Sequence, residues 1–203
     1  MELDLSEVTP TERYKLLIGL VIPRPIAWIS TVNDAGVTNC APFSFFNVLS
    51  EDPALCVVSF NLRSDGLTKH TVKNIRRTGE FVVNLVDETT ANAMHLSSYE
   101  YPEEESEFEK TGVTPAPCSI VKHPRIAEAA ASFECRLWNR MELGPGRELI
   151  FGEILFVHAR EGVIDPATKR ISEPLYHPVG RLFGSRYCTT RQRFDLPGEP
   201  PAK

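Results

Sequence analysis

Apolar residues occur along the chain in short runs, and turn-forming residues separate these runs at short intervals. Two runs, Ala54–Phe60 and Phe81–Val86, are mostly apolar and rich in β-branched residues, which indicates buried strands. In Phe133–Leu143 the apolar side chains fall on alternate positions with charged residues between them, which is the period of a strand. Leu149–Ala159 is predicted to be a further strand, bent at Gly152. The pattern favours many short strands over a few long helices.

A β-hairpin is expected in the first quarter of the chain. The apolar run Pro25–Val32 ends in Asn33-Asp34-Ala35-Gly36, which is typical of a tight turn. A second run, Val37–Val48, follows at once. The two runs are therefore predicted to pair through a short loop.

Helices are predicted to be short and few. The segment Leu67–Thr78 places its apolar residues on one side and ends at Gly79, a typical C-terminal cap. Thr89–Ser98 is a second candidate, and Pro10–Leu20 is a weaker third. Together with Greek-key strand spacing, these elements predict one mainly β domain over residues 1–203, a small closed or split barrel with short helices.

Composition narrows the classes of partner. Apolar residues make up 42% and charged residues 24% of the 203 residues, as in an ordinary globular protein. A net charge of -5 argues against a nucleic-acid-binding protein. No stretch approaches the roughly 20 apolar residues of a membrane span, and the acidic N-terminal segment does not resemble a secretory signal. The acidic run at residues 100–109 is interpreted as a solvated loop.

The candidate reactive residues do not form a recognisable motif. The five cysteines are odd in number and lack CxxC spacing, so we expect no disulfide framework and no zinc site, but reduced thiols in the cytoplasm. His70, His95 and His123 are too dispersed to predict a metal cluster. The sequence has no GxGxxG motif and no βαβ rhythm, so a Rossmann nucleotide site is not expected.

Two linked motifs, PRPIAWIST at residues 23–31 and APFSFFN at 41–47, are specific. They are followed by DPALCVVSF at 52–60 and TKHTVKNIRRTGEFVVNL at 68–85, and then by ASFEC at 131–135, FGEI at 151–154 and GRLFGSRYCTTRQRFDLP at 180–197. In this order the segments resemble the flavin reductase-like family of FMN-binding split-barrel proteins, the group that includes flavoredoxins. The resemblance spans nearly the whole chain.

The resemblance implies a homodimer that binds FMN non-covalently near the subunit interface. It places the flavin ring against the predicted hairpin, where small residues let the backbone approach a flat ring closely. The implied ring-binding residues are Trp28, Ser30, Thr31, Asn39, Ala41, Pro42, Phe43 and Ser44, completed by Ser59, Phe60 and Asn61 at the end of the next strand. Either Phe45 or Phe46 is expected to be in the core instead, because alternate strand positions face opposite sides.

The FMN phosphate is expected at the start of the predicted helix 67–78. Exposed amides and the helix dipole favour an anion there, and cationic side chains add charge-assisted hydrogen bonds. The residues are Arg63, Thr68, Lys69 and Thr71. Arg181, with Tyr187 and Arg191, lies in a segment that either covers the flavin, from one subunit or the other, or forms a solvated basic tail.

One motif departs from the family pattern. Reductases of this family that use NADH typically carry Gly-Asp-His, whereas this chain has Gly146-Arg147-Glu148. An acidic side chain repels the phosphates of a dinucleotide. The resemblance implies an FMN-dependent oxidoreductase, with NAD(P)H:flavin reductase as its sharpest version. The alternatives are a flavoredoxin-like electron carrier reduced by a redox protein partner, which the departure favours, and a non-catalytic flavin-binding protein. No catalytic acid or base is expected, since hydride transfer to a flavin depends on placement.

Overall fold

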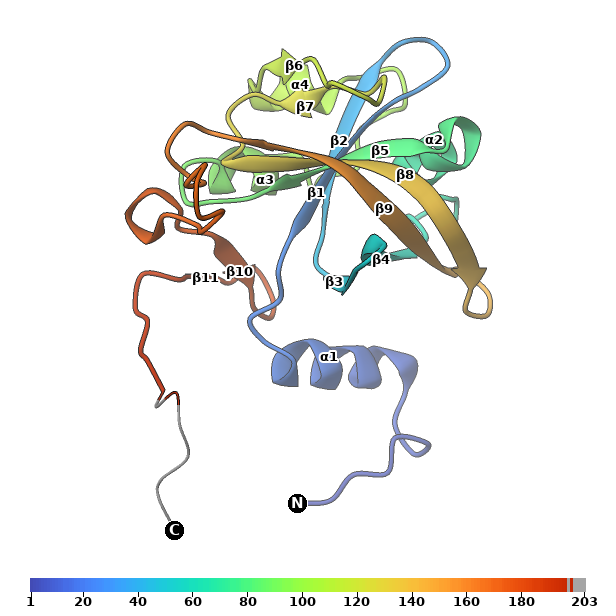
Figure 1. The fold of residues 1–203 in the computed structure, drawn as a ribbon. Coiled ribbons are helices and arrows are strands. Elements are labelled where there is room, and N and C mark those ends of the chain that lie inside the picture. Colours follow the sequence, from blue (N-terminus) through green and yellow to red (C-terminus); the bar gives the residue numbers. More distant parts are fainter. Residues whose placement is uncertain (197, 199–203) are drawn as a thin grey trace.

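The computed structural model describes residues 1–196 and 198. Its centre is a seven-stranded antiparallel sheet with the order β2-β1-β5-β8-β9-β4-β3 (Figure 1). The strands are β1 (Ala27–Val32), β2 (Thr38–Phe43), β3 (Phe46–Glu51), β4 (Ala54–Asn61), β5 (Glu80–Leu85), β8 (Ala131–Glu142) and β9 (Arg147–Ala159). The expected mainly β architecture with crossing connections is confirmed, because β1 pairs with β5 and β4 pairs with β9.

The predicted hairpin is confirmed, but its second run is divided. β1 pairs with β2, whereas the remainder of Val37–Val48 belongs to β3, which pairs with β4. Phe43 and Phe46 both pack in the same core cluster. Three residues apart on one continuous strand, they would face opposite sides of the sheet, so the chain must turn between them.

The two edge strands of the sheet are joined by only two residues, Ser44 and Phe45. The N–H of Ser59 on β4 donates to the carbonyl of Phe45 at 2.8 Å. The sheet therefore curls until the chain itself connects its edges, but β2 and β3 are not neighbours in the hydrogen-bonded sheet. The barrel is split at Ser44-Phe45.

Three predicted helices are present as α1 (Pro10–Leu20), α2 (His70–Thr78) and α3 (Ala91–Leu96). Helix α2 starts three residues later than predicted and ends at Gly79, which has a left-handed φ of 70°. Leu67 lies outside the helix and is exposed. No residue of α1 is buried, and Figure 1 shows that this helix lies apart from the sheet. Within residues 1–196, no helix is long and apolar enough to span a membrane.

The acidic run at residues 100–109 was expected to be a solvated loop, but it is not entirely so. Its end forms part of helix α4 (Glu107–Thr111), in which both Glu107 and Phe108 are buried. Phe108 packs in a core cluster with Trp28 and Met94. The carboxylate of Glu107 is buried together with the neighbouring Phe108. Charge patterning alone does not reveal this burial.

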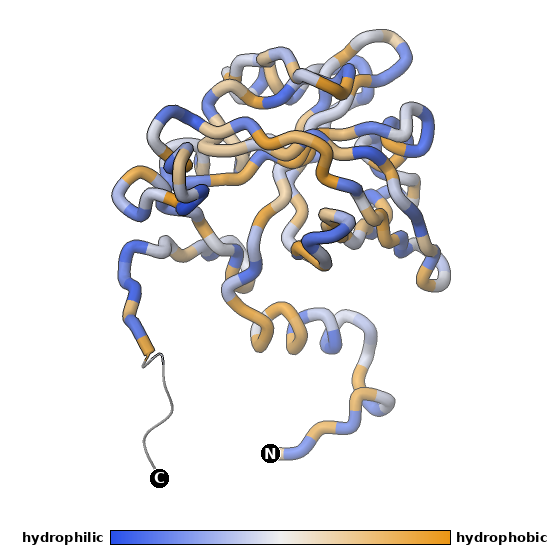
Figure 2. The backbone as a smooth tube through the Cα atoms, viewed as in Figure 1, coloured by the Kyte–Doolittle hydropathy of each residue, from blue (hydrophilic) through white to orange (hydrophobic). Residues whose placement is uncertain are grey.

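Two apolar clusters lie on opposite faces of β1. Ala27 and Ile29 pack in one cluster and Trp28 in the other, as the alternation of a strand requires. Figure 2 shows the hydrophobic colouring concentrated along the central strands. The bend expected at Gly152 is a register shift beside it, with Trp138 as the extra residue on β8. Gly152 itself makes room for the core, since a Cβ there would lie 2.4 Å from the Phe81 ring.

Several small elements were not predicted from the sequence. They are two two-stranded sheets, β6 (Pro115–Ala116) with β7 (Arg125–Ile126) and β10 (Val179–Arg181) with β11 (Tyr187–Thr189), and the short 3-10 helix Glu173–Leu175. The segment between β6 and β7 packs over the outer face of β5 and β8. The β10–β11 hairpin is attached to the barrel through reciprocal backbone bonds between Arg24 and Arg181.

Candidate functional site

A cavity of about 270 Å³ lies where the barrel is split. One wall is formed by the end of β2 and the linker Ser44-Phe45, and another by Ser59 and Asn61 of β4. The start of α2, the loop at residues 97–101, and single residues of β9 and β10 complete it. We call it the split cavity. Chain segments from all parts of the sequence meet here because the barrel fails to close here.

The start of helix α2 forms a cationic end of the split cavity. Lys69 is the N-cap residue but makes no side-chain cap bond, and the first turn contains no acidic residue. His70 and Thr71, which follow it, line the cavity. The first amides of a helix have no partner within the helix. An uncapped start beside a lysine therefore provides several donors for an anion.

Arg63 adds a second cation to this end. Its Nη1 is hydrogen-bonded to Nε2 of His70, whose pKa is lowered by burial and by the arginine charge. Its Nε is buried and has no hydrogen-bond partner among the described residues, although a carboxylate oxygen of Asp65 lies 3.3 Å away. Buried donors are normally satisfied. The unused Nε is thus available to a ligand.

Small and aromatic residues line the split cavity along the end of β2 and the linker Ser44-Phe45. Ala41 and Pro42 present little side chain, and Phe43 packs edge-on against the core residue Phe60 at a centroid distance of 4.5 Å. The guanidinium of Arg147 lies 5.3 Å from the centre of the Phe45 ring and donates to Oγ of Ser59 at 3.0 Å. This side combines small residues and an aromatic wall, which suits a planar ring.

Glu107 lies between these two sides. It is buried, lines the cavity and accepts a hydrogen bond of 3.3 Å from the N–H of Cys40. Burial raises the pKa of Glu107 to about 7. Nearby, Oγ1 of Thr71 donates to Oδ1 of Asn39 at 3.2 Å. The cavity therefore contains a carboxyl group whose charge changes near neutral pH.

Eleven of the sixteen predicted site residues line the split cavity: Asn39, Ala41, Pro42, Phe43, Ser44, Ser59, Asn61, Arg63, Lys69, Thr71 and Arg181. Phe60 and Thr68 instead line a neighbouring cavity of about 200 Å³, which shares Asn61, Lys69 and Arg147 with the first. The structure thus brings most of the predicted set together, although the residues come from separate strands and a helix.

Three predicted residues of β1 are buried away from both cavities. Nε1 of Trp28 donates to Oγ of Ser97 at 2.8 Å, so the indole fixes a residue that lines the split cavity. Oγ of Ser30 donates to the carbonyl of Pro124, and Oγ1 of Thr31 accepts from Asn74. Their hydrogen-bonding groups are committed within the chain.

The cavity residues that the prediction missed are Tyr14, Phe45, His70, Ser97, Ser98, Tyr99, Glu100, Tyr101, Glu107 and Arg147. His70 was detectable in principle, because it directly follows Lys69 at the helix start. The segment 97–107 carries no local signal for a site. It reaches the cavity only because α3 and α4 pack beside β2.

The C-terminal segment was expected either to cover the flavin or to form a solvated basic tail, and its parts behave differently. Arg181 lines the split cavity, and its guanidinium lies 4.7 Å from the ring centre of Tyr187 and is hydrogen-bonded to the phenol oxygen. Arg191 is an exposed residue that pairs with Glu88 and lines neither cavity. Only the beginning of the basic segment therefore belongs to the cavity.

Glu148, which was expected to repel the phosphates of a dinucleotide, has its charge compensated within the fold. It is buried and hydrogen-bonded through both carboxylate oxygens to Arg76, and Arg140 lies 3.5 Å away. These arginines compensate its charge, so its repulsion of a dinucleotide is weaker than the sequence alone indicated. The side chains of Arg76, Lys69 and Arg147 line the neighbouring cavity beside it.

Comparison with known proteins gives consistent matches. Residues 19–185 match the family model of the flavin reductase like domain. A protein from Aquifex aeolicus is 42% identical over 187 residues, which cover 92% of this chain and 94% of the relative.

Two crystal structures resemble the full chain. The 2-nitrobenzoate 2-nitroreductase NbaA of Pseudomonas fluorescens is 36% identical, with a TM-score of 0.90 and coverage of 100% of this chain and 99% of that one. Component B of nitrilotriacetate monooxygenase from Bacillus cereus is 33% identical, with a TM-score of 0.91 and coverage of 97% and 98%.

Proposed function

The chain belongs to the flavin reductase-like family and has its split-barrel fold, and from this premise we propose that it is an FMN-dependent oxidoreductase that binds its flavin in the split cavity. The observation that carries the proposal is the uncapped start of α2 beside Arg63, whose buried Nε makes no hydrogen bond among the described residues and only an ion pair with Asp65. A dianionic phosphate satisfies both. Lysine at the N-cap has no acceptor for the first amides of α2, so these donors are left for a ligand.

The remaining cavity residues suit the rest of FMN. Ser59 and Asn61 offer hydroxyl and amide groups for a ribityl chain, and Ala41 to Phe45 offer a flat wall for the ring. Bound flavin supplies the redox chemistry. The chain supplies binding, orientation and charge. The single domain expected over residues 1–203 is consistent with the family match across residues 19–185.

NAD(P)H is the electron donor that we propose first. The charge of Glu148 is compensated by Arg76, and the cavity beside it shares Lys69 and Arg147 with the split cavity. These cations favour an anionic cosubstrate next to the flavin. The second candidate is a flavoredoxin-like carrier reduced by a redox protein, which the replacement of the family histidine by Glu148 favours. A non-catalytic flavin-binding protein is the third.

We further propose that the protein acts as a homodimer in the cytoplasm. The split cavity, at about 270 Å³, falls slightly below the roughly 300–1,000 Å³ of ligand pockets. Tyr14 of α1 lines it and is exposed, and further exposed apolar residues are Leu17 of the same helix and Val48 and Leu49 of β3. A second copy covering this surface would complete the cavity. None of the five cysteines forms a disulfide, which supports a reducing compartment.

The test begins with the absorption spectrum of protein incubated with FMN and passed through a desalting column. Retained flavin bands that NADH or NADPH bleaches without oxygen support the reductase. Bands that only dithionite bleaches support the electron carrier. A protein that retains no flavin contradicts the proposal, and a monomeric mass by light scattering contradicts the dimer.

A further inference from the structure

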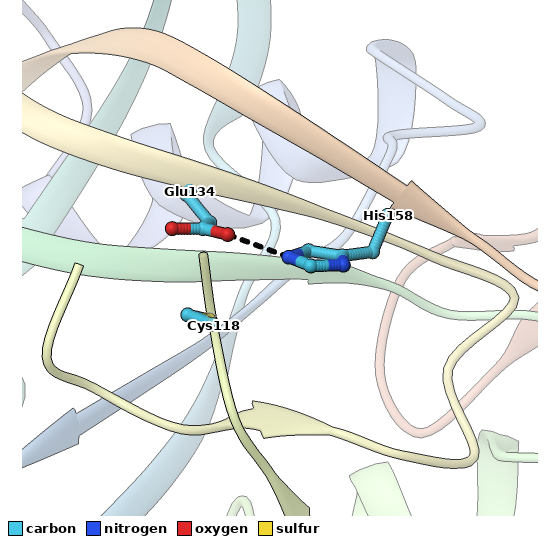
Figure 3. A group of neighbouring side chains, drawn as sticks. All are labelled: Cys118, Glu134 and His158. Carbon is cyan, nitrogen blue, oxygen red and sulfur yellow. Dashed lines mark hydrogen bonds and ion pairs between the residues drawn. The ribbon is translucent and has the colours of Figure 1, made fainter. Parts of the chain in front are cut away.

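A second group of reactive side chains lies away from both cavities. Cys118, Glu134 and His158 come together beneath the segment that joins β6 to β7, and their potential ligand atoms all lie within 4.8 Å of one another (Figure 3). None of the three lines the split cavity or its neighbour. The sequence gives no hint of this group, because its members are scattered over 41 positions.

The strand register explains why two of them meet. Ser132 of β8 lies opposite His158 of β9, so Glu134 and His158 point to the same face of the sheet one diagonal step apart. Nε2 of His158 lies 2.5 Å from Oε1 of Glu134. Figure 3 shows the side chains of Glu134 and His158 directed toward each other, with Cys118 beside them.

Glu134 also holds that loop. Its carboxylate accepts hydrogen bonds from the N–H groups of Ser119, Ile120 and Val121 at 2.6–2.8 Å. A fully buried carboxylate thus lies next to a thiol and an imidazole and holds the loop that carries the thiol.

We propose that Cys118, Glu134 and His158 form a binding site for one zinc ion or a zinc-like divalent transition metal. A thiolate, an imidazole and a carboxylate are ligands that zinc accepts, whereas magnesium and calcium prefer oxygen alone. With the thiol deprotonated, the two negative side chains balance the two charges of the ion. Solvent occupies the fourth position, on the side where His158 is partly exposed.

Zinc binding requires the ligand atoms to move by about 1 Å relative to one another. Zinc bonds of about 2.0–2.3 Å place tetrahedral ligand atoms about 3.4–3.6 Å apart. The present atoms lie within 4.8 Å, and the pair of His158 and Glu134 must separate slightly. On binding, Nε2 and Oε1 exchange their mutual hydrogen bond for the metal, Cys118 releases its proton to solvent, and no redox change occurs.

A metal ion held by these three side chains ties the loop to both β8 and β9. Its role is therefore structural, at a distance from the flavin chemistry.

The test measures bound zinc in untagged full-length protein, since an affinity tag of histidines would bind the metal itself. EDTA-treated protein is mixed with one equivalent of zinc, passed through a desalting column and analysed by elemental mass spectrometry. We expect close to one zinc per chain. Cys118→Ser and His158→Asn should each weaken zinc binding by more than about tenfold, as loss of a ligand does. Cys188→Ser removes a cysteine outside the group and is the matched control.

Two results overturn the proposal: wild-type protein that retains no zinc, or Cys118→Ser that retains as much as wild type. X-ray absorption gives a second measurement that does not depend on how well a variant folds. A zinc–sulfur distance of about 2.3 Å in the wild-type protein supports ligation by the thiolate, and a shell of oxygen and nitrogen alone excludes it. Flavin content is recorded in parallel and is expected to be the same in all variants.

Discussion

Two regions of this barrel differ in whether their buried polar groups have hydrogen-bond partners. Under the β6–β7 segment, Asn84 uses its whole amide: Nδ2 donates to Trp28 and Ser30, and Oδ1 accepts from Ile126 and Ser132, each at 2.9 Å. In the split cavity, by contrast, the start of α2 is uncapped and Nε of Arg63 is unused. Buried polar groups that make all their hydrogen bonds stabilise the fold, whereas groups without a partner can bind a ligand.

The largest effect on stability is expected from removing the side chain of Asn84, which makes all its hydrogen bonds. Asn84→Ala leaves two donors and two acceptors without their partner in a fully buried place. Each buried group left unsatisfied costs about 1–3 kcal/mol, so for four groups we expect a loss of at least about 4 kcal/mol in the free energy of unfolding by urea. The exposed helical variant Asn92→Ala is the control, expected within about 0.5 kcal/mol of wild type. If both variants unfold like wild type, the network does not stabilise the barrel.

The next effect concerns Glu107 in the split cavity. Burial raises its pKa from 4.5 to about 7 in the folded state. The folded protein then binds more protons than the unfolded chain between these values, so stability falls as pH rises from about 4.5 to about 7 and is constant above. The full penalty is about 3 kcal/mol.

Glu107→Gln should therefore be more stable than wild type at pH 8, by up to about 3 kcal/mol, and equally stable at pH 4. The measurement is urea unfolding of flavin-free protein at a series of pH values. Glu109→Gln, on the same helix but exposed, is the control and should leave the wild-type profile unchanged. A Glu107→Gln profile parallel to wild type would show that this carboxyl does not titrate in the cavity near neutral pH.

Arg63→Ala tests directly whether Arg63 contributes to FMN binding. A hydrogen bond to a charged group contributes about 1.5–3 kcal/mol, so FMN affinity should fall by about 10- to 100-fold, measured by flavin fluorescence. Without FMN the variant should also lose some stability, because Arg63 is hydrogen-bonded to His70 and paired with Asp65. Lys73→Ala removes a cation of α2 that pairs with Glu103 and lines neither cavity, and it should bind FMN like wild type. Equal affinity of both variants would place the phosphate elsewhere.

The same contrast shows how far sequence patterns reach. Apolar runs predicted β1 and β4, alternation predicted β8, and the Gly79 cap marked the end of α2, because such signals act over a few neighbouring residues. The break at Ser44-Phe45 was missed, since it depends on Phe43 and Phe46 entering one core. Helix α4 was missed because its formation depends on burial of Phe108 against distant strands.

For the candidate site, the motifs located the β2 wall and the α2 start but did not show which side chains face the cavity. Glu107 and Arg147 reach it only through the packing of remote elements. The pairing of Glu148 with Arg76, over 72 positions, is equally invisible in the sequence. Residues of β1 were included in the prediction because they lie in the motif, although their hydrogen bonds are directed into the fold.

Thr31 gives the smallest and most selective test of this distinction. It belongs to the predicted ring-binding set, yet its Oγ1 accepts from Nδ2 of Asn74 at 3.0 Å in a buried place. Thr31→Val keeps the shape of the side chain but leaves that donor unpaired, which should cost about 1–2 kcal/mol of stability. FMN affinity should equal that of wild type at a temperature where both are folded. A variant with weaker FMN binding and unchanged stability would show that Thr31 belongs to the flavin site. A residue that serves only the fold is expected to lower the stability and to leave the FMN affinity unchanged.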